Sequence, residues 1–484
     1  MPTIQKKMAT GIVWMVSARL LDRGIGVVST LILARLLIPS DFGLVAMAMT
    51  IAAVLDLLGA FNFDLALIQK PNVANKHYDT VWTFNVFFGL FCGITLILLA
   101  MPAASFYRES RLLDVMYALA LAYMIGGFTN VGIVNFRKDL HFRDEFVFSL
   151  FRRVVTFVVT IGGALWFRSY WALVVGIIVG RFAGLLASYK MSSYRPWFTL
   201  SALRELFNFS KWLLINNILF FLLHRGCDFV VGKLYGTTGL GIYTVSYEIS
   251  NLPSTELVAP INRVTFPGFA KMTDRSMMAS SYIKLLGMIS LLILPVGVGI
   301  AAVAEPLILA VLGDKWVSAI PLIELLALYG VISATQTNNG MIWMVLGQPR
   351  TLTMMVVLFL LVLFPSLYFF MTKFGVIGAG YAYLIAHAVT VPISMWIIKK
   401  LLGFGWNELA SATWRPIVAV TAMYIGVSLF DQSIATIDVW PRLIADSFFG
   451  VTLYAFFTVS VWFLVGRPSG AESFCIEKTC AALR

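Results

Sequence analysis

Long apolar segments bounded by charged residues, proline or glycine recur along the whole chain. Each is long enough to cross the ~30 Å hydrocarbon core of a bilayer as a helix that rises 1.5 Å per residue. Prolines between residues 250 and 320 interrupt the pattern, so the sequence predicts twelve to fourteen spanning helices. The fourteen candidate spans are residues 9–34, 42–68, 80–105, 113–134, 146–167, 170–189, 209–233, 238–262, 281–303, 318–346, 352–371, 376–398, 412–430 and 443–466.

The composition supports an all-α integral membrane protein. Of the 484 residues, 60% are hydrophobic and only 12% are charged, whereas about a quarter of the residues in soluble domains are charged. A disordered chain, a disulfide scaffold and an ordinary cytosolic enzyme are excluded. The net charge of +12 reflects membrane topology and contact with anionic headgroups, because no basic stripe with exposed aromatics indicates a nucleic-acid partner.

The distribution of Lys and Arg predicts the orientation of the chain. With the N-terminus inside, most of the 36 basic residues fall on the predicted cytoplasmic segments. The positive-inside rule therefore favours a cytoplasmic location for both the N-terminus and the C-terminus. The first apolar run is too long for a signal peptide and is expected to remain as the first span.

The chain also contains an internal repeat. ARLLIPSDFGLV (34–45) aligns without a gap with GKLYGTTGLGIY (232–243), which places Gly43 on Gly241. Six predicted helices separate the copies, so the repeats are parallel and are related by an axis along the membrane normal. We expect an N-lobe, a linker with a short interfacial helix, a C-lobe, two further helices and a cytoplasmic tail, at 1–195, 196–207, 208–400, 401–466 and 467–484.

Several segments resemble one family of transporters. ARLLIPSDFGLVAMAM with LDLLGAFNFDLALIQK (55–70), CDFVVGKLYGTTGLGIYTVSYEISNLP (227–253), and EPLILAVLGDKW with VLGQPR (345–350) are similar to the polysaccharide transporter family. That family, which includes Wzx-like exporters, belongs to the multidrug, oligosaccharidyl-lipid and polysaccharide flippase superfamily. The resemblance covers residues 8 to 400.

The resemblance implies a fold, a cargo and a location. The fold is the flippase fold shared with multidrug exporters, and the protein is a transporter rather than an enzyme. Its cargo is an undecaprenyl-pyrophosphate-linked oligosaccharide for exopolysaccharide, O-antigen or capsule biosynthesis, carried across the bacterial inner membrane. A polysaccharide polymerase with its chain-length machinery is an implied partner. No cofactor is implied besides a coupling ion, H⁺ or Na⁺.

Charged residues in the first helix form the leading candidate for substrate binding. Ionisable groups inside a membrane are costly and need a partner, a water-filled cavity or a function. Arg19, Asp22 and Arg23 share one face of this helix, where Asp22 can pair with Arg19 at i,i+3. Arginine offers planar, bidentate recognition of phosphate, so the excess positive charge suits a pyrophosphate.

A second group lies in the seventh helix. Asn217, His224 and Asp228 share a face, with Arg225 on its flank. Asn217 and Arg225 are expected to line the same substrate cleft, whereas Asp22, His224, Asp228 and, in the eighth helix, Glu248 are candidates for ion coupling or gating. Asp228 can pair with either His224 or Arg225, and protonation of Asp228 would open that pair. A static buried ion pair is the alternative.

Other polar residues are assigned to packing or to the membrane surface. Arg152 and Arg153 are expected to snorkel to the cytoplasmic headgroups. Arg181 lies in GIIVGRFAG, whose two overlapping G-x-x-x-G steps indicate close helix packing. The polar run ATQTNNG (334–340) is either a locally unwound segment that contacts headgroup or sugar, or a face exposed to water.

The sequence lacks an ATP-binding loop, a metal-ligand motif and a hydrolase motif. Two alternatives to the oligosaccharide flippase remain. An ion-coupled drug or small-molecule exporter of the same superfamily would have a site dominated by acidic residues rather than by arginine. A membrane-embedded glycan polymerase would need a large extracytoplasmic loop, and no such loop is predicted.

Overall fold

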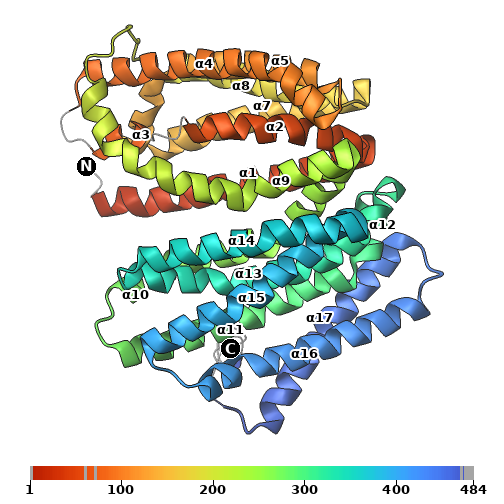
Figure 1. Cartoon of the computed structure of the whole chain (residues 1–484). Helices are drawn as coiled ribbons and strands as arrows, with labels where there is room; N and C mark the ends of the chain where they lie inside the picture. The colour runs from red at the N-terminus through yellow and green to blue at the C-terminus, as the bar shows by residue number, and fades with distance from the viewer. Residues whose placement is uncertain (1–3, 59–62, 70–72, 469–471, 474–484) are drawn as a thin grey trace. The chain divides into compact units, whose positions relative to one another are not determined.

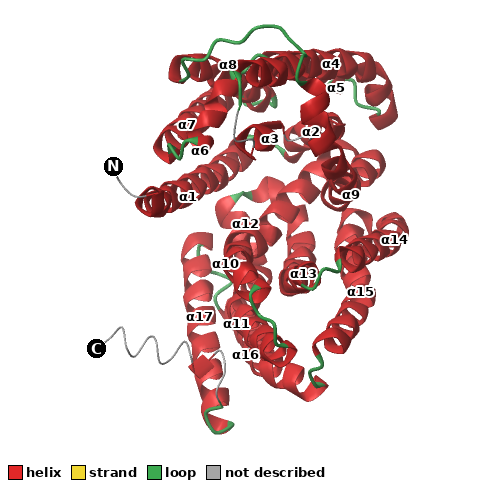
Figure 2. Ribbon diagram, turned by 90° about the vertical axis from the view of Figure 1, so that its left-hand side faces the viewer, coloured by secondary structure: helices red, strands yellow, loops and turns green. Residues whose placement is uncertain are grey.

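The computed structural model describes residues 4–58, 63–69, 73–468 and 472–473, and all the regular elements within these residues are helices (Figures 1 and 2). Their bounds are α1 (Ile4–Leu36), α2 (Pro39–Leu58), α3 (Phe63–Gln69), α4 (Asn75–Tyr107), α5 (Leu112–Gly127), η1 (Val131–Val134), α6 (Asn135–Lys138), α7 (Phe142–Phe167), α8 (Trp171–Met191), α9 (Leu203–Pro253), η2 (Ser254–Val258), α10 (Ala259–Ala270), α11 (Arg275–Ala302), α12 (Ala304–Val311), η3 (Asp314–Ala319), α13 (Ile320–Val345), α14 (Pro349–Phe374), η4 (Gly375–Ile377), α15 (Gly378–Leu402), α16 (Trp406–Ser433) and α17 (Val439–Leu464).

Each of the fourteen apolar segments predicted from the sequence overlaps one or more helices in the described part of the chain, and the all-α membrane architecture is confirmed. Among the described residues, nine helical stretches are long and apolar enough to cross a membrane, or ten if the bent pair at Leu112–Gly127 and Val131–Lys138 is one span. One of these stretches, Pro349–Leu402, contains both α14 and α15. The predicted count of fourteen is compatible with this arrangement.

Two compact units divide the chain, Met1–Gly241 and Ile242–Arg484. In the first unit α4 packs on α5, α7 packs on α8, and α1 lies against α7. In the second unit α11 packs on α13 and α16, and α15 packs on α13 and α14. Buried side chains of α11, α13 and α15, such as Tyr282, Ile342 and Ile398, form the main core of this unit.

A glycine breaks α9 between the predicted seventh and eighth spans. Gly236 has φ 64° and ψ −161°, a conformation that is not helical and that L-amino acids with a side chain rarely adopt. The break separates the predicted spans 209–233 and 238–262, as the sequence indicates.

The two copies of the sequence repeat contact each other through their glycines. A Cβ atom on Gly43 would lie 1.7 Å from the carbonyl oxygen of Thr237, and a Cβ atom on Gly241 would lie 1.8 Å from that of Pro39. In the repeat alignment Thr237 corresponds to Pro39, and Gly241 to Gly43. The contact is therefore reciprocal, as expected for related segments around a two-fold axis, and it supports the alignment.

The linker after α8 differs from the expectation of a separate interfacial helix. Residues 192–200 are extended, and the following helix is continuous with α9. Side chains of α4 bind the backbone of this segment: Asp79 accepts a hydrogen bond from the Trp197 N–H at 2.9 Å, and Thr83 Oγ1 accepts one from the Thr199 N–H at 3.0 Å. These bonds satisfy the backbone without helix formation.

Candidate substrate-binding pocket

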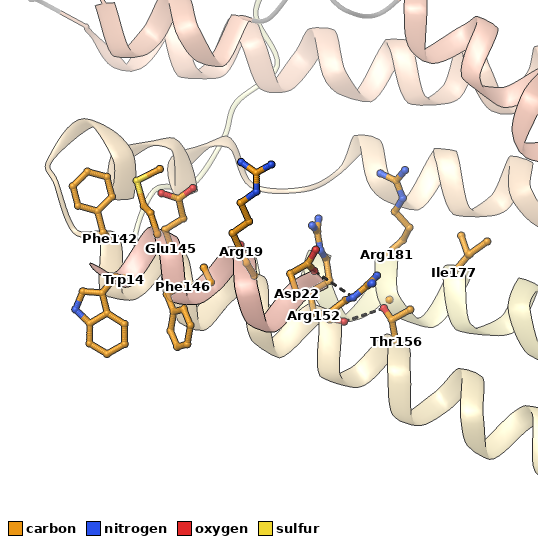
Figure 3. A pocket seen from close by; sticks show the side chains of 15 residues that line it. Trp14, Arg19, Asp22, Phe142, Glu145, Phe146, Arg152, Thr156, Ile177 and Arg181 are labelled. Atoms are coloured by element: carbon orange, nitrogen blue, oxygen red, sulfur yellow. Dashed lines mark hydrogen bonds and ion pairs between the residues drawn. The ribbon is translucent and has the colours of Figure 1, made fainter. Parts of the chain in front are cut away.

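A pocket of about 630 Å³ opens in the first unit between α1, α7 and α8. Figure 3 shows that aromatic side chains stand at one end of it and Arg181 at the other. It is lined by Trp14, Met15, Ala18, Arg19, Asp22, Phe142, Glu145, Phe146, Ser149, Arg152, Arg153, Thr156, Ile177, Gly180 and Arg181.

Arginines dominate the charge of this pocket. Arg19 comes from α1, Arg152 and Arg153 from α7, and Arg181 from α8, whereas the carboxylates of the lining are those of Asp22 and Glu145. The lining therefore carries an excess of two positive charges. Three helices that are distant in sequence converge to produce it.

Both carboxylates already have a partner. Asp22 Oδ1 lies 3.3 Å from Arg153 Nε, and Glu145 pairs with Arg137, which is not part of the lining. Within the described part of the chain, no carboxylate lies at salt-bridge distance from Arg19, Arg152 or Arg181. Three guanidinium groups are thus available to an anionic ligand.

Glycines bring the arginines of α7 close to their neighbours. A Cβ atom on Gly180 would lie 2.1 Å from Thr156 Oγ1, and one on Gly176 would lie 1.9 Å from Thr160 Oγ1. Gly184 leaves room for the aliphatic stem of Arg152, with its Cδ 3.2 Å from such an atom. The prediction that the G-x-x-x-G steps mark close helix packing is confirmed.

The guanidinium of Arg181 lies over an aromatic ring of α5. Its Cζ is 5.5 Å from the centroid of the Tyr123 ring, a cation–π distance. The Tyr123 hydroxyl donates a hydrogen bond of 2.7 Å to Asp56 Oδ2 on α2. Asp56 therefore fixes the ring that supports Arg181.

The structure corrects one sequence-based expectation at this site. Asp22 pairs with Arg153 of α7 rather than with Arg19, because α7 lies directly against α1. Arg152 and Arg153, which were expected at the headgroups, line the pocket about three turns inside α7. Arg23 is half-buried and is not part of the lining.

Of the residues predicted as a second group in the seventh and eighth helices, only Arg225 and Asp228 are seen in contact with each other in the part of the chain that the structure describes. Arg225 Nη1 lies 3.3 Å from Asp228 Oδ2, and Thr50 of α2 donates a 3.2 Å hydrogen bond to the same oxygen. Asp228 is buried. Neither residue lines the arginine pocket, and Glu248 is half-buried in the second unit. The side chains of Asn217 and His224 lie outside the described residues.

The polar run 334–340 is helical throughout, so the interpretation as an unwound segment is wrong. Asn339 accepts a hydrogen bond from the Tyr282 hydroxyl at 2.5 Å and donates to Ser394 Oγ at 2.6 Å. Ser394 in turn donates to Gln336 Oε1 at 2.7 Å. These bonds connect α11, α13 and α15 inside the second unit, so the polar residues hold helices together.

Sequence comparison decides the family. A model of the family described as "Polysaccharide biosynthesis protein" matches residues 32–321. The chain belongs to this family.

Individual relatives cover most of the chain. It is 23% identical over 424 residues to the lipopolysaccharide biosynthesis protein WzxC of Escherichia coli (strain K12), covering 86% of this chain and 85% of that protein. It is 23% identical over 441 residues to the teichuronic acid biosynthesis protein TuaB of Bacillus subtilis (strain 168), covering 90% of this chain and 91% of that protein. The succinoglycan biosynthesis transport protein ExoT of Rhizobium meliloti (strain 1021) is 26% identical over 344 residues, which is 69% of each chain.

Solved structures support the same fold. The lipid II flippase MurJ in an inward closed conformation superposes with a TM-score of 0.75 at 11% identity, over 94% of this chain and 99% of that one. A multidrug resistance MATE family transporter in an inward-facing conformation gives a TM-score of 0.57 at 14% identity, over 81% of this chain and 98% of that one. The expected flippase-superfamily fold is confirmed.

Proposed function

We propose that the chain is an alternating-access exporter that flips undecaprenyl-pyrophosphate-linked oligosaccharide repeat units across the bacterial inner membrane, for exopolysaccharide, O-antigen or capsule biosynthesis. The observation that carries the proposal is the pocket in which Arg19, Arg152 and Arg181 have no carboxylate at salt-bridge distance among the described residues. A pyrophosphate diester carries two negative charges, which equals the excess positive charge of the lining. Guanidinium groups bind such oxygens bidentately.

The opposite end of the pocket suits a sugar. Trp14, Phe142 and Phe146 line it, and the rings of Trp14 and Phe146 are 5.1 Å apart between centroids. Aromatic rings present large rigid surfaces, and sugar rings have apolar faces that pack on them. A ligand with an anionic linkage next to a sugar matches both ends of the pocket.

The names of the relatives support this cargo. WzxC, TuaB and ExoT are named for lipopolysaccharide, teichuronic acid and succinoglycan, which are all glycan polymers, and ExoT is named as a transport protein. We extend that role to this chain as a transporter without enzymatic activity of its own. A polysaccharide polymerase is the expected downstream partner.

For the transport cycle we propose that the predicted lobes, 1–195 and 208–400, alternate between inward and outward access, with both termini in the cytoplasm. Helices 401–466 are an addition to them, joined to a tail at 467–484. The pair of Arg225 and the buried Asp228 is the proposed coupling switch, because protonation of Asp228 would release Arg225. His224, Asn217 and Glu248 stay candidates for the same cleft.

A drug exporter of the same superfamily is the second candidate, favoured by the fold shared with a MATE transporter. Cationic drugs require acidic residues, whereas the pocket here is basic. The two candidates therefore predict opposite responses to the charge of the ligand.

The sidedness of lipid-linked intermediates tests the proposal. A strain that lacks the protein should accumulate complete repeat units on the cytoplasmic face, and the wild-type gene should clear them, whereas Arg19→Met with Arg152→Met should not. Arg143, an exposed arginine of α7 outside the pocket, supplies the control variant Arg143→Met. A normal pool on both faces would contradict the proposal and favour the drug exporter.

A further inference from the structure

The first turn of α17 carries a buried arginine, Arg442, that contacts two carboxylates. Arg442 Nε lies 2.5 Å from Asp431 Oδ1, and its Nη2 lies 2.8 Å from Asp431 Oδ2, so the pair is bidentate. The same Nη2 is 3.4 Å from Glu305 Oε2. Arg442 is only 8% exposed and connects α12, α16 and α17.

A second aspartate lies one helical turn after this arginine. Asp446 is 0% exposed, and neither of its carboxylate oxygens receives a hydrogen bond from a donor in the described part of the chain. Arg442, which binds Asp431 bidentately, precedes Asp446 by four residues on α17, so both aspartates lie beside the same guanidinium group. A buried carboxylate without a donor is strongly unfavourable, so Asp446 requires a ligand.

The surrounding charges limit what that ligand can be. The groups facing Asp446 are Asp431 from α16 and Arg442 on its own helix. Glu305 from α12 contacts Arg442, and Glu324 of α13 faces Glu305 in turn. α11 contributes Leu291, whose carbonyl oxygen accepts a hydrogen bond from Tyr454.

A divalent metal ion does not fit this cluster. In the described ranges no three His, Cys, Asp or Glu side chains are placed to hold a metal ion. Two adjacent carboxyl groups can instead share a proton, because both cannot ionise side by side at low cost. The smallest cation therefore suits the site best.

We propose that Asp431 and Asp446 form a binding site for one proton. A proton from the surrounding solution adds to one carboxylate oxygen, and the resulting O–H donates to the other carboxylate. Arg442 balances the single negative charge that remains. Glu305, whose side chain is 54% exposed, connects the cluster with the surroundings. The proton site is independent of any ligand in the arginine pocket.

Thermal unfolding of the purified full-length protein across a pH series tests this site. The folded state would hold a proton that the unfolded chain releases, so the midpoint of the wild type should rise by up to about 1–2 °C for each unit that the pH falls. Asp446→Asn supplies a permanent hydrogen-bond donor and should lose that pH-dependent rise. Asp438→Asn, at an exposed aspartate just before α17, should follow the wild type.

Parallel curves for the wild type and Asp446→Asn would overturn the proposal. A midpoint raised by NaCl over choline chloride in the wild type, and not in Asp446→Asn, would also overturn it, because the occupant would be a metal cation.

If Asp446→Asn does not fold, infrared spectroscopy replaces it. The wild type should show the carbonyl stretching band of a protonated carboxylic acid, and Asp431→Asn should lose it. Absence of the band in the wild type, or a band unchanged in Asp431→Asn, would contradict the shared proton.

Discussion

Arginine has opposite roles in the two units. In the pocket of the first unit, four arginines line the wall with two carboxylates. Three of the four arginines have no carboxylate of the described residues at salt-bridge distance. In the second unit a single arginine, Arg442, lies among Asp431, Asp446 and Glu305. The ratio of arginine to carboxylate therefore distinguishes a surface ready for an anion from a cluster that holds a cation.

Exposure agrees with the charge ratio. Arg19, Arg152 and Arg181 are exposed, whereas Arg442 is buried. An exposed arginine costs little stability and is free to bind a ligand. A buried arginine balances carboxylates that could not remain charged without it. Substitutions in the two regions should consequently affect different measurements.

The largest expected effect is on stability. Arg442→Met leaves the buried Asp446 and the partly buried Asp431 without their counter-charge and should lower the free energy of unfolding by about 3–5 kcal/mol. Arg19→Met, at an exposed position, should change it by no more than about 0.5 kcal/mol. Denaturant titrations of both variants measure the difference. Equal losses of stability would mean that the distinction between the two regions is wrong.

Asp22→Asn should change ligand affinity rather than stability. The substitution removes the partner of Arg153 and leaves four uncompensated arginines. An anionic ligand should therefore bind up to about fivefold more tightly, because an ion pair at this exposure contributes about 0.2–1 kcal/mol. Titration with inorganic pyrophosphate measures the change. Weaker binding would show that Asp22 positions Arg153 instead of competing for it.

Tyr123→Phe should weaken ligand binding modestly. The variant loses the hydrogen bond to Asp56 that orients the ring beneath Arg181, and one such bond contributes about 0.5–1.5 kcal/mol. Affinity should fall by about twofold to tenfold. Tyr117→Phe, on an exposed part of α5, is the control, and an equal loss in both variants would contradict a specific role for Tyr123.

The smallest effect concerns a surface pair between α4 and α5. The hydrogen bonds from Arg111 hold the pKa of Glu109 below its usual value. The contribution of the Glu109–Arg111 pair to stability is therefore present above the pKa that Glu109 has in the unfolded chain. It is lost as the pH falls through the lower pKa that Glu109 has in the folded protein. Glu109→Gln should remove less than about 1 kcal/mol at neutral pH and nothing at low pH. A pH-independent loss would contradict this.

Hydropathy and glycine spacing predicted much of the fold, because both depend on local sequence. The spans, the break at Gly236 and the close packing at Gly180 follow from runs of apolar residues and from missing side chains. The separate interfacial helix predicted for the linker is not formed, because Asp79 and Thr83 of α4 bind the backbone of the linker. These contacts come from residues distant in sequence, so local sequence could not predict them.

The candidate site was only partly predictable for the same reason. Arg19 and Asp22 are recognisable as charges inside an apolar helix, but their partners on α7 and α8 depend on which helices are neighbours. Arg181 directly follows Gly180 in a helix-packing motif. A charged residue within an apolar run was the signal that could have assigned Arg181 to the site. Asp446 gave a similar signal, as a charged residue within the predicted span 443–466. Its burial beside Arg442 and Asp431 depends on the packing of α16 and α17, which the sequence does not show.

The most direct test of the account is equilibrium binding of a synthetic undecaprenyl-pyrophosphate-linked sugar to the purified protein, with its monophosphate counterpart as the reference ligand. Arg19→Met combined with Arg152→Met should weaken binding of the pyrophosphate by more than about a hundredfold, since each charged hydrogen bond contributes roughly 1.5–3 kcal/mol. Arg143→Met should bind as the wild type does. Undiminished binding by the double variant, or an equal loss in Arg143→Met, would contradict the claim that this pocket receives the pyrophosphate.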